Sequence, residues 1–369
     1  MTFRVNDQVT ASVFIAGREF LLDYGNSLRS LHIQASSLLH LPQMRISFVD
    51  TLDQMPNFGL QDGAQITVQI NSTVTTTRNF RVFHWDRDPA PQGFVYTIDC
   101  YWDAPRYWAG TSQAGIRGSS SQALQDIAST CGLKWWSKND NTSDSMLWLP
   151  GNKTFAAFAR DIARAGYISD TSHMGLAVDS IGNMLYLDIN KIPKPEISVG
   201  TLAVQGGGHF LMCTDFTPQT KSGTNNLVGG YRHNRYVQSV NGTLELDNLE
   251  DELQFDSDSK YPLLSQDVRG RMVRGGVSYG HVDFGNVHDK YERAKYQNGR
   301  YNLLNSLTGE VLFPFQTSWE PFQNFSLAQP ADLESSQYNG EYTIRDKIIF
   351  IQGTTYVEKL VAVKNGLGS

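Results

Sequence analysis

The residues best suited to chemistry stand together in the segment His84-Trp85-Asp86-Arg87-Asp88. An imidazole and two carboxylates could work as general acid and base, or could bind a metal ion with a third ligand from elsewhere in the chain. The two carboxylates share one face of a strand only if the strand continues past them, and Pro89 predicts that it ends there. We therefore favour a polar strand end in which Arg87 pairs with a neighbouring acid.

A glycine run, Gly206-Gly207-Gly208-His209, has the composition of a loop that cradles phosphate. Such a loop must open a helix, whereas the residues from Phe210 to Phe216 read as a strand. The glycines therefore predict a bulge or a tight turn. The chain has no Gly-x-Ser-x-Gly motif, and Ser119 to Ser121 stand at the start of a predicted helix, so no nucleophile is predicted.

Three further features are partial signals for ligands. Residues 256–260 resemble half of a calcium loop, but the central glycine and the closing glutamate are missing. The basic and aromatic segment from Tyr231 to Tyr236 is short and lies in an acidic chain, so a hairpin surface is the better interpretation. Trp108, Trp135 and Trp136 could stack on sugars, or could be buried anchors. We predict no catalytic, cofactor-binding or metal-ligating residue, and no cofactor.

The composition predicts a folded chain that coats neither nucleic acid nor a membrane. Its 369 residues are 40% hydrophobic and 18% charged, which suits two or three domains with real cores. The net charge is −6, whereas a nucleic-acid coat needs clustered positive charge. No apolar run approaches the roughly 18 residues of a membrane helix, and the N-terminal residues lack the pattern of a signal peptide. Cys100, Cys131 and Cys213 predict buried free thiols in a reducing compartment.

The elements that would position these residues begin with β-strands over residues 8–70. Apolar and polar residues alternate there between turn signals, as half-buried antiparallel strands require. The predicted strands lie near residues 9–15, 31–35, 44–50 and 64–70, with two more near 80–84 and 94–100. Strands at this spacing predict a small barrel or sandwich.

A mixed α+β unit follows these strands. Apolar residues at helical spacing predict a helix between a serine N-cap at 119–121 and a stop at Gly132. A second helix is predicted from an N-cap at Asn152 to Gly166. A hairpin with strands 174–178 and 184–189 completes the unit.

The last part of the chain returns to β-structure. Strands interrupted by glycines are predicted over residues 196–240, followed by an acidic segment at 245–260 and a helix from Val287 to Tyr296. The final strands are predicted at 340–344, 348–350 and 356–363, with turns near Asp346 and at Gln352-Gly353. No exact internal sequence repeat is present. The predicted fold class is mainly β with an α+β insert.

Three blocks of the sequence occur in an order that is typical of one class of proteins. The first block consists of Leu31–Ala35, Arg45–Asp50 and Leu60–Val68. The second consists of Ala123–Leu133, Asn141–Leu149, Phe155–Gly166 and the Asp179-x-x-Gly182 hairpin. The third consists of Tyr338–Ile344 and Tyr356–Leu360. Together they resemble the central hub proteins of contractile phage baseplates, the late-control-D class; residues 241–300 do not align with that pattern.

The resemblance implies two tail-tube-like antiparallel β-barrel domains and a small α+β domain. The implied boundaries are 1–76 for the first barrel, 77–195 for the α+β domain, and 196–369 for the second barrel with an insertion at about 241–300. It also implies a structural virion protein without catalytic activity. This protein would form a homotrimeric ring that joins the six-fold tail tube to the three-fold spike and lines the channel.

The partners implied by the resemblance are the tail tube or tube-initiator protein, the central spike protein and the baseplate wedge proteins. DNA would pass through the channel as cargo only, and no membrane contact is expected. The implied location is the tail baseplate of the virion, after assembly in the host cytoplasm.

Two other functions remain open from the sequence. A tail-associated glycan-cleaving enzyme would use two carboxylates held roughly 5–9.5 Å apart across a cleft. The candidates are Asp86, Asp88, Asp99 and Asp103. A carbohydrate-binding adhesin would present Trp108, Trp135 or Trp136 to a sugar. A large chain without a coherent catalytic set favours the structural role.

Overall fold

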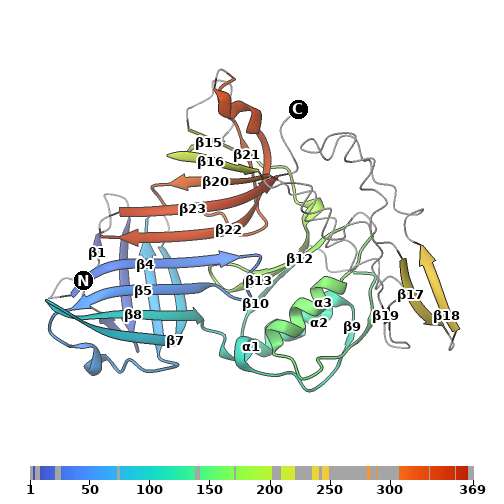
Figure 1. The fold of residues 1–369 in the computed structure, drawn as a ribbon, viewed down its shortest axis with the longest axis horizontal. Coiled ribbons are helices and arrows are strands. Elements are labelled where there is room, and N and C mark those ends of the chain that lie inside the picture. The colour runs from blue at the N-terminus through green and yellow to red at the C-terminus, as the bar shows by residue number, and fades with distance from the viewer. Residues whose placement is uncertain are drawn as a thin grey trace.

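The chain is built around one large curled sheet of 15 strands, with a small α+β unit packed beside it (Figure 1). The computed structural model describes residues 3–4, 9–20, 26–72, 75–137, 142–169, 172–201, 209–220, 235–240, 243–248, 281–282, 288, 307–331, 333–353 and 355–364. The predicted class, mainly β with an α+β insert, is confirmed. The predicted buried free cysteines, Cys100, Cys131 and Cys213, are confirmed as well.

One end of the large sheet curls into a first lobe, which we call lobe 1. Its strands pair in the order β2 (Thr10–Ile15), β6 (Gln65–Asn71), β7 (Thr75–Ala90), β8 (Gly93–Trp102), β5 (Gln43–Asp50) and β4 (Asn26–Ser36), with β1 (Phe3–Arg4) and β3 (Arg18–Phe20) beside β2. Every second side chain of β6 and β8 is buried, as the alternating sequence predicts. These side chains form one apolar core with Phe48, Phe80 and Tyr96, and the 3₁₀ turn η1 (Met55–Phe58) contributes Met55.

The other end of the sheet forms lobe 2, which has its own core. Its strands are β14 (Ile197–Gly200), β15 (His209–Met212), β16 (Asp215–Thr220), β20 (Leu307–Phe313), β21 (Asn324–Leu327), β22 (Gly340–Gln352) and β23 (Thr355–Lys364). Backbone hydrogen bonds from Cys213 N–H to the Gly200 carbonyl and from Thr214 N–H to the Leu312 carbonyl join β14 and β20 through the bend between β15 and β16. Lobe 2 is therefore a ring of hydrogen-bonded strands around Phe325, Tyr342 and their neighbours.

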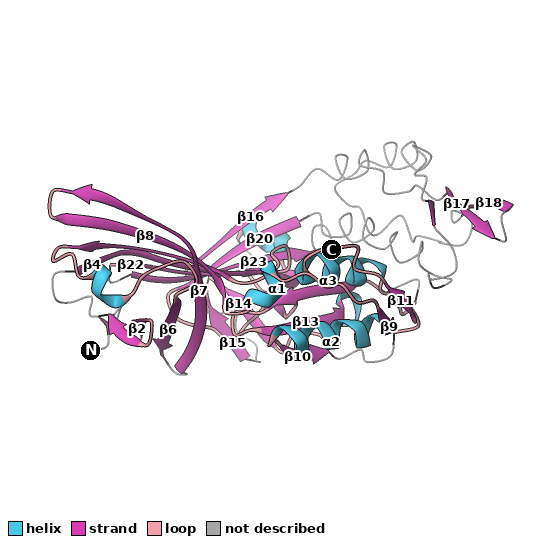
Figure 2. Cartoon of the chain, turned by 90° about the horizontal axis from the view of Figure 1, so that it is seen from below, coloured by secondary structure: helices cyan, strands magenta, loops and turns pink. Residues whose placement is uncertain are grey.

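The α+β unit lies between the two lobes in the sequence. It contains three helices, α1 (Pro105–Ala109), α2 (Ser120–Cys131) and α3 (Phe155–Ala165), and the strand pair β9 (Ile116–Gly118) and β11 (Met146–Trp148). It also contains a sheet in the order β10 (Lys134–Ser137), β13 (Asn183–Asp188) and β12 (Met174–Val178). The 3₁₀ turn η2 (Ile189–Lys191) follows β13 in the chain. Ser119 caps α2 with a capping box, and Gly132 ends the helix in the left-handed conformation, as predicted. Seen from below, the long strands of lobe 1 extend away from these helices (Figure 2).

Outside these three parts, the structure describes only a few residues. They are β17 (Arg235–Val240), β18 (Thr243–Asn248) and β19 (His281–Val282), which form a small sheet, and His288. The 3₁₀ turn η3 (Glu334–Tyr338) belongs to lobe 2, where Tyr338 packs against the core. His288 Nε2 lies 2.9 Å from the Ala165 carbonyl oxygen and is not helical; the rest of the helix predicted for 287–296 lies outside the described residues. No helix in the described ranges is long and apolar enough to span a membrane.

Several local predictions need correction. The second helix begins after Thr154, whose hydroxyl accepts a hydrogen bond from Ala157 N–H, and Asn152 stands in the preceding turn with a positive φ. The strand through His84 continues past Pro89 to Ala90, because a proline fits an edge strand when its nitrogen faces away from the paired neighbour. The turn predicted near Asp346 is a bulge inside the single strand β22.

The core of lobe 1 contains residues from both sides of the implied boundary at residue 76 and from the β22–β23 hairpin. The implied boundary at residue 76 falls inside β7, which pairs with β6, and Phe80, Val82 and Ile98 belong to the core of lobe 1. Ile349, Ile351 and Tyr356, at the tip of the β22–β23 hairpin, belong to that same core. The strand predicted at 210–216 consists of β15 and β16, which bend at Cys213 and Thr214.

Candidate functional site

The two lobes are joined by a continuous face of eight strands. Their order is β7-β8-β5-β4-β22-β23-β20-β16, and Figure 1 shows them stacked from β16 at the top to β7 at the bottom. Every neighbouring pair in this face is antiparallel. The first four strands belong to lobe 1 and the last four to lobe 2. The lobes meet where Leu31–Ser36 of β4 pairs with Asp346–Ile351 of β22, which we call the internal joint.

Each lobe contributes one long hairpin to this face, and the two hairpins have the same register. The matching cross-strand pairs are Val82–Cys100 with Ile344–Ala362, His84–Asp99 with Asp346–Val361, and Ala90–Gly93 with Gln352–Thr355. Each register shifts once, after Val82 in β7 and after Ile344 in β22. The hairpins β7–β8 and β22–β23 are therefore structural repeats, although the sequence contains no exact repeat.

The bulge divides each long strand into two parts with different neighbours. Before the bulge, β7 pairs with β6 and β22 pairs with β21, so these parts close the lobes. After the bulge, both strands lie in the eight-strand face. There Asp346–Ile351 pairs with β4, whereas residues 84–90 of β7 pair with β8 alone among the described strands.

A cluster of buried charged side chains lies beside the internal joint. Lys347 and Glu358 are 2% and 0% exposed. The Lys347 Nζ donates hydrogen bonds to the carbonyl oxygens of Thr317 (3.0 Å) and Trp319 (2.8 Å), and it lies 3.7 Å from the Glu358 carboxylate. Glu358 accepts hydrogen bonds from the backbone N–H and hydroxyl of Thr317. The pair thus satisfies backbone groups of the buried Thr317 and Trp319 in the loop that follows β20.

The same loop connects lobe 2 to the α+β unit through Glu320. Its carboxylate accepts hydrogen bonds from the Ser180 N–H (2.8 Å) and hydroxyl (2.5 Å), and it lies 3.3 Å from Lys347 Nζ. Asp179, next to Ser180, accepts hydrogen bonds from the N–H groups of Ile181 and Asn183 and fixes the β12–β13 turn.

Lobe 1 contributes Arg78 to this meeting point, and its guanidinium donates to Ser180 Oγ at 3.4 Å. We call Lys347, Glu358, Glu320, Asp179 and Arg78 the junction cluster, because it connects all three parts of the molecule.

Burial sets the protonation behaviour of the junction cluster. Desolvation raises the pKa of Glu358 although Lys347 opposes the shift. Desolvation and the nearby Glu320 raise the pKa of Asp179 to about 6. Desolvation also lowers the pKa of Arg78, whose Nε has no hydrogen-bond partner in the part of the chain that the structure describes. Lys347, Glu358, Arg78 and Asp179 are buried, and their hydrogen bonds position the three parts of the molecule.

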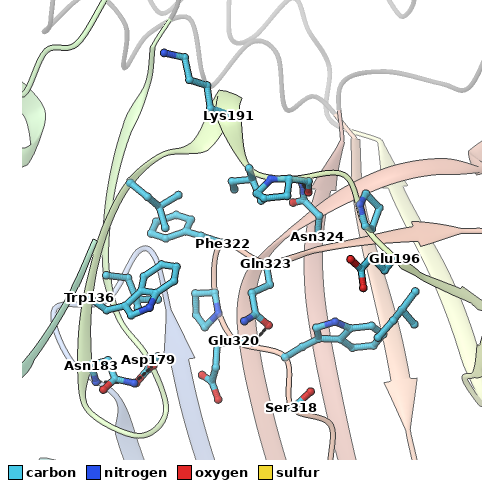
Figure 3. A pocket seen from close by; sticks show the side chains of 18 of the residues that line it. Trp136, Asp179, Asn183, Lys191, Glu196, Ser318, Glu320, Phe322, Gln323 and Asn324 are labelled. Carbon is cyan, nitrogen blue, oxygen red and sulfur yellow. Dashed lines mark hydrogen bonds between the residues drawn. The ribbon is translucent and has the colours of Figure 1, made fainter. Parts of the chain in front are cut away.

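A groove of about 690 Å³ lies beside the junction cluster (Figure 3). The half-exposed Trp136 and the turn residues Asp179 and Asn183 line one side, and Phe322 and Glu320 line the other. The carboxylates of Asp179 and Glu320 already accept hydrogen bonds from the turn around Ser180. Both carboxylates on the wall of the groove therefore hold the turn in place.

Three of the four carboxylates proposed for glycan cleavage lie beside a basic side chain. Asp99 pairs with Arg45 and Asp103 with Arg81, each at 2.6 Å. Asp86 lies 3.3 Å from His84 on the exposed outer part of β7, and Asp88 lies on the same strand. The predicted pairing of Arg87 with an acid is confirmed, because its guanidinium lies 2.7 Å from Asp53. These carboxylates do not converge on the groove.

The aromatic candidates divide between anchors and surface. Trp135 packs near the ring of the buried Tyr186, with centroids 6.3 Å apart, so it is an anchor of the α+β unit. Trp108 lies against Phe83 and Tyr101 on the outside of lobe 1. Trp136 remains 42% exposed at the groove.

The serine segment and the loop candidates do not form a site among the described residues. Ser119 is the N-cap of α2, and Ser120 is buried with its hydroxyl bonded to Asp144. The glycine run 206–208 and residues 231–234 and 256–260 lie outside the described residues. Within the described ranges, no group of three or more His, Cys, Asp or Glu side chains could hold a metal ion.

The junction cluster was missed by sequence reasoning, although the sequence contains one signal for it. Glu358 is in phase with Tyr356 and Leu360 along β23, and both of these are buried. Strand alternation therefore places a carboxylate on the inward face, where it needs a partner. Nothing local identifies Lys347 as that partner, since the pair forms only when the hairpin closes.

Comparison with known proteins finds a similar fold and no similar sequence. No family model matches the sequence, and no curated protein matches it. A tail protein from Neisseria meningitidis has a TM-score of 0.62 at 9% identity, over 98% of each chain. The 43 kDa tail protein of prophage MuSo2 from Shewanella oneidensis has a TM-score of 0.60 at 11% identity, over 98% of this chain and 100% of that one. The chain therefore shares the fold of these two tail proteins. Both alignments include the two lobes and the α+β unit, since each spans nearly the whole chain.

Proposed function

We propose that this protein is a structural component of a phage tail, the central hub of the baseplate, and that it forms a trimeric ring between a six-fold tail tube and a three-fold spike. The observation that carries the proposal is the repeat of the long hairpin in the two lobes. Its support from other proteins is the fold shared with two tail proteins along the whole chain.

The repeat has a symmetry consequence that suits such an adaptor. Three chains with one lobe each present three equivalent surfaces, whereas three chains with two similar lobes present six. The α+β unit and the small sheet of β17, β18 and β19 occur once per chain among the described residues and keep three-fold symmetry. One ring can thus contact a six-fold partner on one face and a three-fold partner on the other.

The proposal includes the partners and the location. The partners are the tail tube or tube initiator, the central spike and the wedge proteins, and DNA crosses the ring as cargo. The protein acts in the virion tail after assembly in the host cytoplasm and performs no catalysis. Within the chain, we propose that lobe 1 comprises residues up to Trp102 and the tip of the β22–β23 hairpin, with the α+β unit from Asp103 to Lys191.

Light scattering combined with size exclusion, followed by electron microscopy of the purified chain, tests the proposal. We expect a mass of three chains and a ring with six similar lobes around a channel. A particle that stays monomeric at all concentrations would contradict the proposal. Clearing of host cell wall by the wild-type chain, lost in Asp86→Asn or Asp103→Asn, would instead establish a glycan-cleaving enzyme.

A further inference from the structure

A cavity of about 940 Å³ lies beside the groove, at the meeting point of the three parts of the molecule. Described residues from all three parts line it: Thr76 and Arg78 of lobe 1, Ile181 of the α+β unit, and Leu211, Phe315 and Trp319 of lobe 2. Ile181 and Trp319 line the groove as well, so the two hollows are neighbours. The volume is within the range of about 300–1,000 Å³ that is typical of pockets for small molecules.

The walls of this cavity combine apolar side chains with one unpaired cation. Trp319 belongs to the core of lobe 2, and Leu211 and Phe315 pack against that core. Three charged residues line the cavity among the described residues, and two of them, Lys347 and Glu320, lie 3.3 Å apart. The third, Arg78, forms no ion pair with a carboxylate in the described part of the chain. The cavity therefore has one guanidinium available to a ligand.

The Arg78 guanidinium has unused capacity for hydrogen bonds. Arg78 is 1% exposed; its Nη1 donates to the Thr76 hydroxyl at 2.6 Å, and its Nη2 has a longer contact of 3.4 Å with Ser180 Oγ. The buried Nε–H has no acceptor among the described residues. By contrast, Arg81 on the same strand is 36% exposed and pairs with Asp103 at 2.6 Å. A buried cation needs such a partner more than an exposed one, because its desolvation costs more free energy.

The carboxylates of the junction cluster do not supply the missing acceptor. Those of Glu320, Glu358 and Asp179 each accept a hydrogen bond from a backbone N–H of the loop or turn that they hold. Glu320 and Glu358 also lie beside Lys347. These carboxylates lower the electrostatic cost of burying Arg78 from a distance, and they leave its Nε–H for an acceptor from outside the chain.

We propose that the cavity binds a small monocarboxylic acid with an apolar body. The carboxylate pairs with Arg78 through the Nε–H and a neighbouring N–H, because the planar fork of an arginine matches the two oxygens of a carboxylate. The apolar body lies against Ile181, Leu211 and Phe315. A dianionic phosphate fits less well, since the other cation among the described lining residues, Lys347, is already paired. The site needs a single chain and does not depend on the proposed ring.

Isothermal titration calorimetry of the purified full chain tests the site with octanoate as the probe. We expect saturable binding of one octanoate per chain. Octanamide has the same body without the charge, and acetate has the charge without the body. Each should bind at least tenfold more weakly, because octanamide loses the charge-assisted pair and acetate loses the contact with the apolar walls. The comparison of the three probes uses the wild-type chain, so it remains valid if changes at Arg78 disturb folding.

Two variants locate the binding in the cavity. Arg78→Gln removes the guanidinium, and Ile181→Trp fills part of the cavity while keeping the backbone hydrogen bond to Asp179. Each should weaken octanoate binding at least tenfold. Arg81→Gln is the control for charge, because Arg81 lies on the same strand and does not line the cavity. Ile192→Trp is the control for size, because Ile192 lines the groove and not the cavity.

Thermal unfolding gives a second readout and shows whether each variant is folded. The lining residues come from all three parts, so the acid binds the folded arrangement and not the unfolded chain. Octanoate at ten times its Kd should therefore raise the Tm of the wild type. Octanamide at the same concentration should raise it less, and octanoate should raise the Tm of Arg78→Gln less as well.

Weaker binding in both cavity variants, with unchanged binding in both controls, would support the site. Equal binding of octanoate and octanamide would overturn the pairing with Arg78, and equal binding of octanoate and acetate would overturn the role of the apolar walls. A loss in Ile192→Trp alone would place the ligand in the groove and overturn the assignment, as would the absence of saturable octanoate binding. None of these outcomes depends on the particle mass in light scattering, so the proposed ring is tested separately.

Discussion

The two lobes place the same hairpin over different interiors. In lobe 1, Trp85 and Tyr96 stack with ring centroids 6.3 Å apart. The matching positions in lobe 2 are Lys347 and Glu358, because Trp85 faces Ile98 as Lys347 faces Leu360, and Tyr96 faces Arg87 as Glu358 faces Ile349. An aromatic pair in the core region of one lobe is thus replaced by a buried ion pair in the other.

The loops beneath these pairs explain the difference. In lobe 1, the loop after β5 is held by its own Asp50, which accepts hydrogen bonds from the N–H groups of Leu52 (3.2 Å) and Met55 (2.9 Å). In lobe 2, the loop after β20 is held by Lys347 and Glu358 from the neighbouring hairpin. That loop also carries Glu320 to the α+β unit. The two lobes thus share the backbone of the hairpin. Lobe 2 has buried charged side chains at the place where the α+β unit attaches, and lobe 1 has aromatic ones at the matching positions.

Of the changes that test the difference between the lobes, Glu358→Ala is expected to lower the free energy of unfolding most. The change leaves Lys347 buried without its carboxylate and removes the acceptor for Thr317 N–H, so the free energy of unfolding should fall by about 3–5 kcal/mol. Urea unfolding of the full chain measures it. Glu358→Gln keeps an acceptor and should lose less. A loss below 1 kcal/mol for the alanine variant would contradict the role of the pair.

A second experiment replaces the buried Lys347–Glu358 pair of lobe 2 by apolar side chains, like those at the matching positions of lobe 1. If Lys347 and Glu358 served only each other, the combined Lys347→Met and Glu358→Leu replacement would restore most of the stability. Because they also satisfy the Thr317–Trp319 backbone, we expect the double variant to stay destabilised by about 2–4 kcal/mol. Full recovery in urea unfolding would show that the loop finds other partners.

The turn that attaches the α+β unit should make stability depend on pH. Burial raises the pKa of Asp179 from 3.8 to about 6 in the folded state, so the folded chain binds the proton more tightly than the unfolded chain. Its stabilising contribution is complete below pH 3.8 and is lost as the pH rises through 6, a change of roughly 3 kcal/mol. Asp179→Asn should flatten the difference in unfolding free energy between pH 5 and 7. Asp126→Asn on exposed α2 is the control, and an unchanged slope in Asp179→Asn would exclude this assignment.

Asp50, the carboxylate that holds the loop after β5 in lobe 1, should contribute less to stability than Glu358 does in lobe 2. Asp50→Ala removes a buried acceptor from the N–H groups of Leu52 and Met55, and we expect a loss of about 1–3 kcal/mol in urea unfolding. Asp50→Asn retains one acceptor oxygen, so its free energy of unfolding should lie between those of Asp50→Ala and the wild type. If Asp50→Ala cost as much as Glu358→Ala, the two lobes would not differ in the way proposed.

The smallest effect is expected on the exposed side of the face. Arg45 donates two hydrogen bonds to Asp99, but its side chain is 61% exposed. Arg45→Ala should therefore change the free energy of unfolding by less than about 1 kcal/mol, and the difference should shrink further in high salt. A larger loss would indicate that this surface is buried in the assembled protein.

Local patterns predicted much of the fold, because they act within a few residues. Alternation identified the strands around Ile46 and Val68, and the serine and glycine signals fixed both ends of the helix 120–131. The internal joint was not predictable in this way, since β4 and β22 are distant in the chain and each reads as an ordinary strand. The junction cluster had only the phase of Glu358 as a signal, and Asp179 and Arg78 look like common turn and strand residues until the three parts meet.

The internal joint has a consequence for biosynthesis. The core of lobe 1 includes Ile349, Ile351 and Tyr356 of the β22–β23 hairpin, which the ribosome synthesises long after β4. Until that hairpin emerges, the nascent lobe lacks part of its interior and its β4 edge is unpaired, which is the situation in which newly made chains depend on chaperones. Chains that stop before residue 340 should therefore aggregate and fail to assemble. Only complete chains would then enter the assembled particle.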